Sequence, residues 1–307
     1  MDKSLYLILP AHNESGNIFP IYEEICNALT DTNYDFHILF VNDGSTDDTL
    51  EKIKSLANND TRVRYISLSR NFGHQNAIKA GLDHADTSIV IMMDCDLQHP
   101  PHLINEMLAC YEQGYDIVRT KRKEQQHEGY LKRKLSKQFY RLLSSISDIH
   151  VEEGSADFRL VSGKALEQLR MFDEFDLFYR GIIKWIGFKQ ISIEYTPSPR
   201  RFGETKYTFQ RMVSFGLKGF TSFSTRPLYF AAYAGVFFAC LSILYIPYIL
   251  YSMYHGHVVE GWTSVLASIV FFGGLNLMIL GLIGVYLSKV FLQIKNRPHY
   301  IVKETNI

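Results

Sequence analysis

The chain has 307 residues, 47% of them hydrophobic and 21% charged, and its 32 basic side chains balance 32 acidic ones. That length supports a full hydrophobic core with one further small domain or appendage, and the neutral charge excludes nucleic-acid binding by bulk electrostatics. The four cysteines lack CxxC spacing, so we expect free, reduced thiols rather than a zinc site or a disulfide framework.

Strand and helix patterns alternate through the first hundred residues. Runs rich in β-branched and aromatic residues predict strands at 4–9, 36–41, 63–68 and 88–93, with helical patterns at 17–29, 47–57 and 73–84 between them. This alternation predicts an α/β fold with a mostly parallel sheet covered by helices. The N-terminal apolar run is too short for a signal peptide, so we expect it to be a strand in a cytoplasmic domain.

Polar clusters follow each predicted strand, namely LPAHNE, VNDGSTDDT, SRNFG and MMDCDLQHPP. In parallel α/β sheets, ligands bind beyond the carboxyl ends of the strands. We therefore expect these four clusters to meet at one functional edge of the sheet.

The fourth cluster sets Asp94 and Asp96 one residue apart, with Gln98 two residues further on. Like charges at this spacing repel unless a cation or hydrogen-bond donors neutralise them. One interpretation is a strand that runs into a solvated turn, because Asp and Pro are ordinary turn residues. The other is a divalent metal held by hard oxygen ligands. This stretch alone leaves both open.

Two basic segments carry interleaved apolar residues. Residues 119–150 are rich in Lys and Arg, and within them 130–143 predict an amphipathic helix; a second candidate lies at 206–226. Such a helix can be a solvated surface, or it can lie on an anionic membrane.

Two apolar runs follow Arg226, at 227–254 and 262–290, and the second carries no charge before Lys289. Each exceeds the roughly 20 residues that span a hydrocarbon core, although a buried helix pair of a soluble protein is the alternative. The connector HGHVVEG has no Lys or Arg, whereas cations flank the pair. The positive-inside rule therefore predicts a multi-pass protein with both ends, including a tail at 291–307, in the cytoplasm.

The order of these motifs, together with SRNFGHQNAIKAGLDHA, DFRL and RRFGETKYTF, resembles the inverting family 2 glycosyltransferases of GT-A (Rossmann-like) fold. The likeness covers nearly the whole chain and points to the polyisoprenyl-phosphate branch. That branch includes dolichol-phosphate mannose synthases and bacterial undecaprenyl-phosphate glucosyltransferases with two C-terminal membrane helices. The implied layout is a catalytic domain at 1–205, a juxtamembrane helix at 206–226, two membrane helices and a tail.

The resemblance implies metal-dependent transfer of a sugar from a nucleotide diphosphate sugar, with UDP-glucose favoured, to undecaprenyl phosphate. The reaction would take place at the cytoplasmic face of the cell inner membrane and serve cell-envelope glycans such as lipopolysaccharide, and relatives imply a homo-oligomer. One alternative is a dolichol-phosphate mannose synthase-like enzyme that uses GDP-mannose. Another is a non-catalytic membrane subunit that binds nucleotide sugar or assists a flippase.

The resemblance also assigns the donor site. Pro10, Asn13, Glu14 and Asp43 would bind the nucleoside, with Asp94 near the ribose. Asp94, Asp96 and Gln98 would hold Mg²⁺ or Mn²⁺ on the diphosphate, which would remove the repulsion between the carboxylates. His99 stands where relatives usually carry Asp or Asn, so we expect it behind the metal ligands.

Asp157 matches the catalytic base of the family. A lipid monophosphate has a second pKa of about 6, so little proton removal is needed and Asp157 could instead orient the acceptor or a basic residue. The alternative is a helix cap or an ion-pair partner of Arg159. Arg180 matches an active-site segment of relatives, whereas His74 and His127 are expected to be structural or exposed.

Cations of the RRFGETK loop would bind the phosphates, because Arg forks and Lys suit phosphate oxygens. Arg201 and Lys206 are assigned to the nucleotide sugar. The lipid phosphate is assigned to Arg122, Arg133, Arg200 and Lys206.

Overall fold

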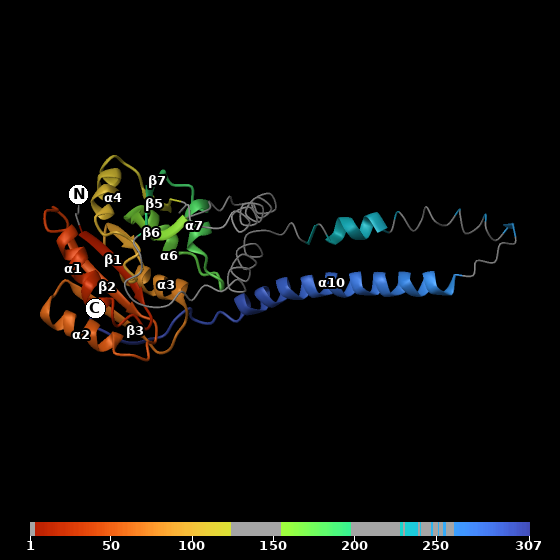
Figure 1. Cartoon of the computed structure of the whole chain (residues 1–307), viewed down its shortest axis with the longest axis horizontal. Coiled ribbons are helices and arrows are strands. Elements are labelled where there is room, and N and C mark those ends of the chain that lie inside the picture. The colour runs from red at the N-terminus through yellow and green to blue at the C-terminus, as the bar shows by residue number, and fades with distance from the viewer. Residues whose placement is uncertain are drawn as a thin grey trace. The chain divides into compact units, whose positions relative to one another are not determined.

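The computed structural model describes residues 4–123, 155–197 and 261–307, with scattered positions between 228 and 255 (Figure 1). The described residues fall into two compact units. The first contains 4–123, 155–197 and 298–307, and the second contains the described residues from 228 to 297.

The first unit is built on a sheet that has eight strands within the described residues, in the order β7-β5-β6-β4-β1-β2-β3-β8. The strands are β1 (Ser4–Ala11), β2 (Asp35–Asn42), β3 (Val63–Leu68), β4 (Ile89–Met92), β5 (Ile117–Arg122), β6 (Ser155–Ser162), β7 (Gln190–Tyr195) and β8 (Val302–Thr305).

The four strands predicted from the sequence form the parallel centre, where β1 pairs with β2 and β4, and β2 pairs with β3. Their near-continuous burial is typical of strands covered on both faces. The sheet as a whole is mixed, because β6 runs antiparallel to both β4 and β5, and β8 runs antiparallel to β3. Hydrophobic periodicity does not encode strand direction, so the sequence could not predict these reversals.

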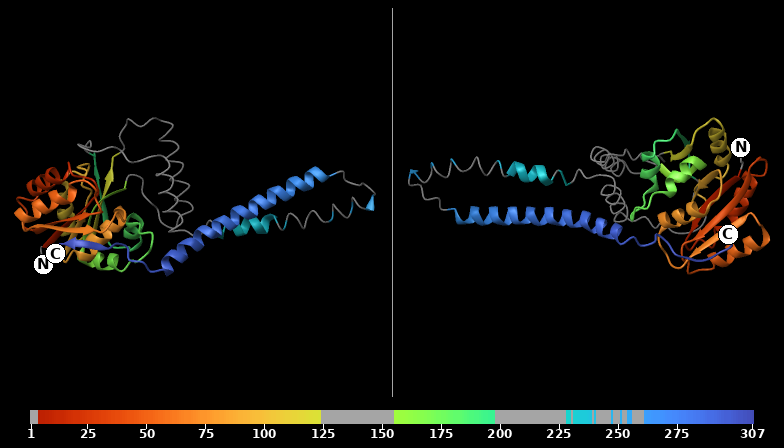
Figure 2. Two further views of the ribbon diagram at one scale, coloured as in Figure 1. Left: turned by 90° about the horizontal axis from the view of Figure 1, so that it is seen from below. Right: turned by 180° about the vertical axis from the view of Figure 1, so that it is seen from behind.

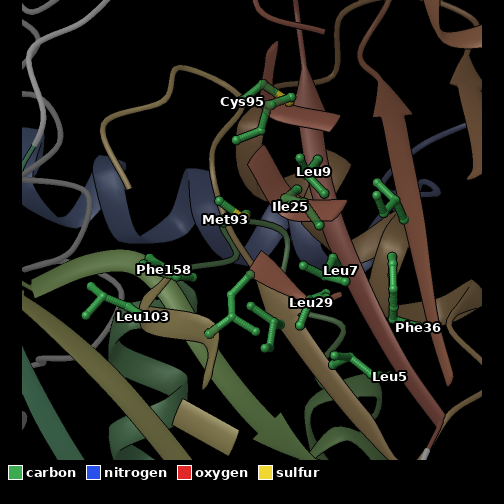
Figure 3. Packing of buried hydrophobic residues seen from close by; sticks show 14 of the residues in the cluster. Leu5, Leu7, Leu9, Ile25, Leu29, Phe36, Met93, Cys95, Leu103 and Phe158 are labelled. Atoms are coloured by element: carbon green, nitrogen blue, oxygen red, sulfur yellow. The ribbon is translucent and has the colours of Figure 1, made fainter. Parts of the chain in front are cut away.

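The helices of this unit are α1 (Ile18–Ala28), α2 (Thr49–Asn59), α3 (His74–His84), α4 (Leu103–Glu112), α6 (Gly163–Arg170) and α7 (Tyr179–Trp185). Helix α1 buries Ile21 and Ile25 against β1 residues such as Leu7 and Leu9 (Figure 3). Helix α3 approaches β1 closely at Gly81, where a Cβ atom would lie 2.4 Å from the Ile8 side chain. This close approach fixes α3, whose first residue faces the functional edge.

The second unit contains α10 (Trp262–Ile294), which extends four residues beyond the predicted membrane helix. Within the described residues, one helix segment, Phe271–Ile294, is long and apolar enough to cross a membrane. Half of the other predicted span, 227–254, lies outside the described residues. Within it, 231–238 are helical, and the Phe238 ring lies 5.4 Å from that of Phe272. The amphipathic segments predicted at 130–143 and 206–226 also lie outside the described residues.

The tail expected at 291–307 begins inside α10 and ends at the edge of the sheet of the first unit. After α10, residues 302–305 form β8 at the edge of β3, and the marked C-terminal end lies at this sheet in both views of Figure 2. The final residues are therefore an integral part of the first unit, which the sequence did not indicate.

Candidate functional site

The loop after β1 is fastened to the turn after β2. Pro10 lies near the end of β1, and Asn13 follows in the left-handed region with φ 55°. The Asn13 side-chain oxygen accepts the Thr46 amide proton at 2.8 Å, and the Glu14 amide donates to the Thr49 hydroxyl at 3.0 Å. These contacts bring the first two polar clusters together. The side-chain oxygen of Asn13 is therefore engaged in a hydrogen bond to the turn after β2.

Asp43, at the end of β2, is buried and binds the loop between β3 and α3. Its two carboxylate oxygens accept the amide protons of Phe72 and Gly73 at 2.7 and 2.9 Å. Gly44 has φ 60°, and a Cβ there would lie 2.3 Å from the Arg70 carbonyl carbon, so the turn and the loop interlock only with glycine. Asp43 therefore fixes this loop.

The turn after β4 carries the paired carboxylates. The Asp96 Oδ1 accepts the Gln98 amide proton at 3.1 Å, and Leu97 between them has φ 59°. A left-handed backbone is uncommon for leucine, so the surrounding contacts hold this turn in a sparsely populated conformation. The Asp94 amide donates a hydrogen bond to the Nδ1 of His99 at 3.2 Å, and this bond links the two ends of the turn.

His99 is fully buried and stacks on the Phe158 ring, with ring centroids 5.3 Å apart. Burial lowers the pKa of His99, so the imidazole is neutral, and its Nδ1 is the acceptor for the Asp94 amide. The charges of Asp94, Asp96, Arg122 and Asp157 all act on this ring. His99 is therefore influenced by the charges of four residues that the sequence assigned to the site, and its hydrogen bond with the Asp94 amide supports the turn.

The donor set of this turn suits a hard divalent cation. Among the described residues, no group of three His, Cys, Asp or Glu side chains converges as a complete metal cage. Mg²⁺ needs no such cage, because it is held by one or two carboxylates together with substrate phosphates and water. Asp94, Asp96 and Gln98, the three residues that the sequence assigned to the metal, carry oxygen atoms of the type that such a partial shell uses.

Asp157, on β6, is buried between two arginines. Its Oδ1 accepts from the Nη2 of Arg159 at 2.7 Å and from the Nε of Arg180 at 3.0 Å, and its Oδ2 accepts from the Nη2 of Arg180 at 2.7 Å. Arg159 is fully buried, whereas the Arg180 side chain is 24% exposed. The carboxylate therefore binds Arg180 through both oxygens, and part of the Arg180 side chain is exposed to solvent.

The ionisation of Asp157 follows from this environment. Burial opposes the charge, but the charges of Arg180 and Arg159 and the hydrogen bonds of Arg180 outweigh it, so the pKa of Asp157 lies well below its usual range. An effective general base has a pKa near the working pH. A carboxylate paired in this way is a weak proton acceptor, and its geometry is that of an anchor for Arg180.

His74 joins these groups, although the sequence had placed it among structural or exposed histidines. It is the first residue of α3 and follows Gly73, whose amide binds Asp43. Its Nε2 lies 3.4 Å from Asp94 Oδ1 and 3.8 Å from Asp157 Oδ2. The signal that could have found it was its place directly after the third strand-end cluster, SRNFG.

The family model described as glycosyl transferase family 2 matches residues 6–170, more than half of the chain, and its span includes the first four strands, the paired carboxylates and Asp157. The chain belongs to glycosyl transferase family 2. It is accordingly a glycosyltransferase, as the sequence motifs predicted.

Relatives of this glycosyltransferase match along almost their whole length. A Shigella flexneri protein named SfII prophage-derived bactoprenol glucosyl transferase is 38% identical, covering 98% of this chain and 97% of its own. An Escherichia coli (strain K12) prophage bactoprenol glucosyl transferase homolog is 37% identical, covering 97% of each chain. A crystal structure of Mycobacterium tuberculosis glucosyl-3-phosphoglycerate synthase with Mn²⁺, UDP-glucose and phosphoglyceric acid is 16% identical, covers 70% of this chain and 76% of that one, and has a TM-score of 0.45.

The remaining predicted cations of the glycosyltransferase divide into two groups. Arg122, on β5, donates from its Nε to the Tyr195 hydroxyl at 3.1 Å, and its charge acts on His99. Four others lie outside the described residues: Arg133, Arg200, Arg201 and Lys206.

Glu14, which the sequence assigned to the nucleoside, acts electrostatically on the same buried thiol as the paired carboxylates. Burial is the main cause of the raised pKa of the Cys95 thiol, and the charges of Glu14, Asp94 and Asp96 raise it further.

Proposed function

We propose that this glycosyltransferase moves a hexose, with glucose favoured, from a UDP-sugar to undecaprenyl phosphate with inversion at the anomeric carbon. The observation that carries the proposal is the cluster of Asp94, His74, Asp157 and Arg180 at the edge of a family 2 catalytic sheet. The acceptor class is supported by the relatives whose names include bactoprenol glucosyl transferase, which cover 97–98% of this chain.

The acceptor phosphate is its own nucleophile in this reaction. One of its oxygens attacks the anomeric carbon, a new carbon–oxygen bond forms, and the bond to the diphosphate breaks on the opposite face, so configuration inverts. Since the second pKa of a phosphate monoester is about 6, most of the acceptor is dianionic near neutral pH and gives up no proton. The reaction can therefore proceed with Asp157 permanently ionised.

Arg180 supplies a cation for a phosphate at this site. The fork of a guanidinium binds phosphate oxygens through paired N–H groups, and the grip of Asp157 holds Arg180 in one orientation before substrate arrives. Preorganised charge of this kind stabilises the transition state without reorganisation. Asp157 thus contributes through Arg180, which corresponds to the orienting role left open for it by the sequence.

A divalent metal, Mg²⁺ or Mn²⁺, would be held by Asp94, Asp96 and Gln98. When bound, it supplies positive charge that stabilises the departing diphosphate. Without a metal the chain leaves Asp94 and Asp96 facing a diphosphate of like charge, so donor binding depends on the cation.

Chelation should therefore stop the reaction. EDTA added to the membrane-bound enzyme is expected to reduce transfer by about a hundredfold or more, and excess Mg²⁺ or Mn²⁺ should restore it. Transfer that persists at the untreated rate in EDTA would contradict the metal assignment.

The membrane arrangement follows the layout predicted from the sequence. We propose that α10 and the run at 227–254 cross the cell inner membrane as a pair, with the catalytic unit and both termini in the cytoplasm. The support is the apolar segment Phe271–Ile294 and the contact of Phe238 with Phe272. This arrangement brings the soluble donor and a membrane-embedded acceptor to the same enzyme.

A donor panel tests the proposal. Membranes that contain the enzyme and undecaprenyl phosphate are incubated with labelled UDP-glucose, UDP-galactose, UDP-N-acetylglucosamine and GDP-mannose, and the glycolipid is extracted into solvent. We expect label in the lipid phase from a UDP-hexose, at rates at least about tenfold above those with the other nucleotides. Labelling from GDP-mannose alone would favour the mannose synthase alternative. Donor binding without any glycolipid would favour the non-catalytic subunit.

A further inference from the structure

The last ten residues, 298–307, belong to the first compact unit, and the mechanism above does not use them. Strand β8 pairs antiparallel with β3, with Leu68 opposite Val302 and Ile66 opposite Thr305. The Ser69 amide, just beyond β3, donates to the Ile301 carbonyl at 2.9 Å. The segment therefore covers the edge of β3 and continues one residue into the loop that follows.

Side chains fasten this strand on both sides. The Asn306 Oδ1 accepts the Tyr65 amide proton at 2.6 Å, and its Nδ2 donates to the Val63 carbonyl at 3.2 Å. Glu304 accepts from the Nζ of Lys54, on α2, at 2.7 Å. These contacts join β8 to a helix as well as to a strand, so the pairing is specific to this edge.

The loop that begins at Ser69 leads directly into the site. Residues 69–73 carry the Phe72 and Gly73 amides that bind Asp43, and the next residue is His74, 3.4 Å from Asp94. A hydrogen bond at Ser69 therefore fixes the start of the segment that ends at the carboxylate cluster.

The other end of α3 is held by the same tail. The Tyr300 hydroxyl donates to Asp83 Oδ2 at 3.0 Å, while Asp83 Oδ1 accepts from the buried Lys79 at 2.7 Å. The Tyr300 ring also lies 6.0 Å from that of His84, the last residue of α3. Burial and Asp83 raise the pKa of Tyr300, so the phenol remains a proton donor at physiological pH.

We propose that residues 298–307 are a positioning element for the active site, which hold the stretch 69–84 at both ends and so set the Asp43-bound loop and His74. Tyr300 and Ile301 are its positioning residues. The donor-binding consequence rests on the proposed function, whereas the positioning itself does not. Helix α10 ends at Ile294, so the segment that directly follows this apolar helix would take part in positioning the active site.

The test uses the full-length chain in detergent or membranes with mild substitutions. Tyr300→Phe removes one hydroxyl, Asn306→Ala removes two backbone contacts, and the two are combined. Lys303→Ala is the matched control, because its exposed side chain lies on the same strand and its loss leaves these contacts intact. The readouts are hydrogen–deuterium exchange of residues 69–84 without ligand, and the KM and kcat for the nucleotide sugar.

We expect the combined variant to exchange about tenfold faster at residues 69–84, the effect of losing one hydrogen bond to a charged group, with a rise in donor KM of similar size. The Lys303→Ala variant should match the parent in both. Unchanged exchange at 69–84 would overturn the proposal, and so would faster exchange spread equally over β1, β2 and β4, which would indicate general destabilisation. A parent enzyme that binds no nucleotide sugar would refute the proposed function, while the exchange result would still decide the positioning.

Discussion

Replacing Asp96 by Asn should abolish sugar transfer while the fold survives. The Asp96 Oδ1 accepts the Gln98 amide proton at 3.1 Å, and the carbonyl oxygen of an asparagine can accept the same bond in nearly the same shape. The substitution therefore keeps the turn but removes one of the charges that would hold the metal. We expect kcat/KM to fall by about a hundredfold or more, with a melting temperature close to that of the parent. The measurement is glycolipid formation alongside thermal unfolding.

Asp60→Asn is the control for this result. Asp60 precedes β3 at the opposite end of the sheet, where Arg62 holds its pKa at about 2 through hydrogen bonds against the opposing effect of burial. Loss of that carboxylate should cost about 1 kcal/mol of stability or less, since the pair is partly exposed, and leave transfer unchanged. If Asp96→Asn keeps native activity, Asp96 does not belong to the metal shell.

The sequence predicted the parallel centre of the fold because local pattern decides it. The runs at 4–9, 36–41 and 63–68 are apolar enough to be buried on both faces, and each became a strand within two residues of the expected bounds. Strand β8 was missed for the opposite reason. VKET is short and polar, so its strand conformation comes from pairing with β3, which is a long-range contact.

The candidate site shows the same division. Asp43, Asp94 and Asp157 could be nominated from the sequence because each lies on a strand, or just after one, within a recognisable motif. The ion pair of Asp157 with Arg159 was among the alternatives predicted from the sequence, and the structure shows it at 2.7 Å. The contacts of His74 and Arg180 with the carboxylates were not predicted, since they depend on tertiary register. His74 reaches Asp94 only because α3 packs on β1 at Gly81, and Arg180 reaches Asp157 across 23 residues of sequence. The motifs thus nominated candidate carboxylates, and the structure shows which groups each of them contacts.

Arg180→Gln is expected to separate the two roles considered for Asp157. The variant removes the Arg180 guanidinium but leaves Asp157 paired with the buried Arg159 at 2.7 Å. The carboxylate therefore keeps a counter-charge, and the fold should hold. If Asp157 acts by orienting Arg180, kcat/KM should fall by about a hundredfold. If Asp157 were an independent base, loss of Arg180 would leave proton transfer in place. Arg62→Gln, in the partly exposed pair with Asp60, is the matched control and should leave transfer unchanged.

The double variant decides between these roles, because residues that act as a unit are not additive. Asp157→Asn alone should impair transfer and also destabilise the fold by about 3 kcal/mol or more, since it leaves Arg159 buried without a counter-charge. The stabilising contribution of Asp157 is present above the unfolded carboxyl pKa near 4. It is lost as the pH falls below that value toward the depressed folded pKa, so the parent and the Asp157→Asn variant should converge in stability in acid.

In the Arg180→Gln background, Asp157→Asn should lower kcat/KM by less than about threefold further. Multiplying effects of the two substitutions would instead indicate that Asp157 has a catalytic task of its own, and a proton-transfer role would have to be restored to it.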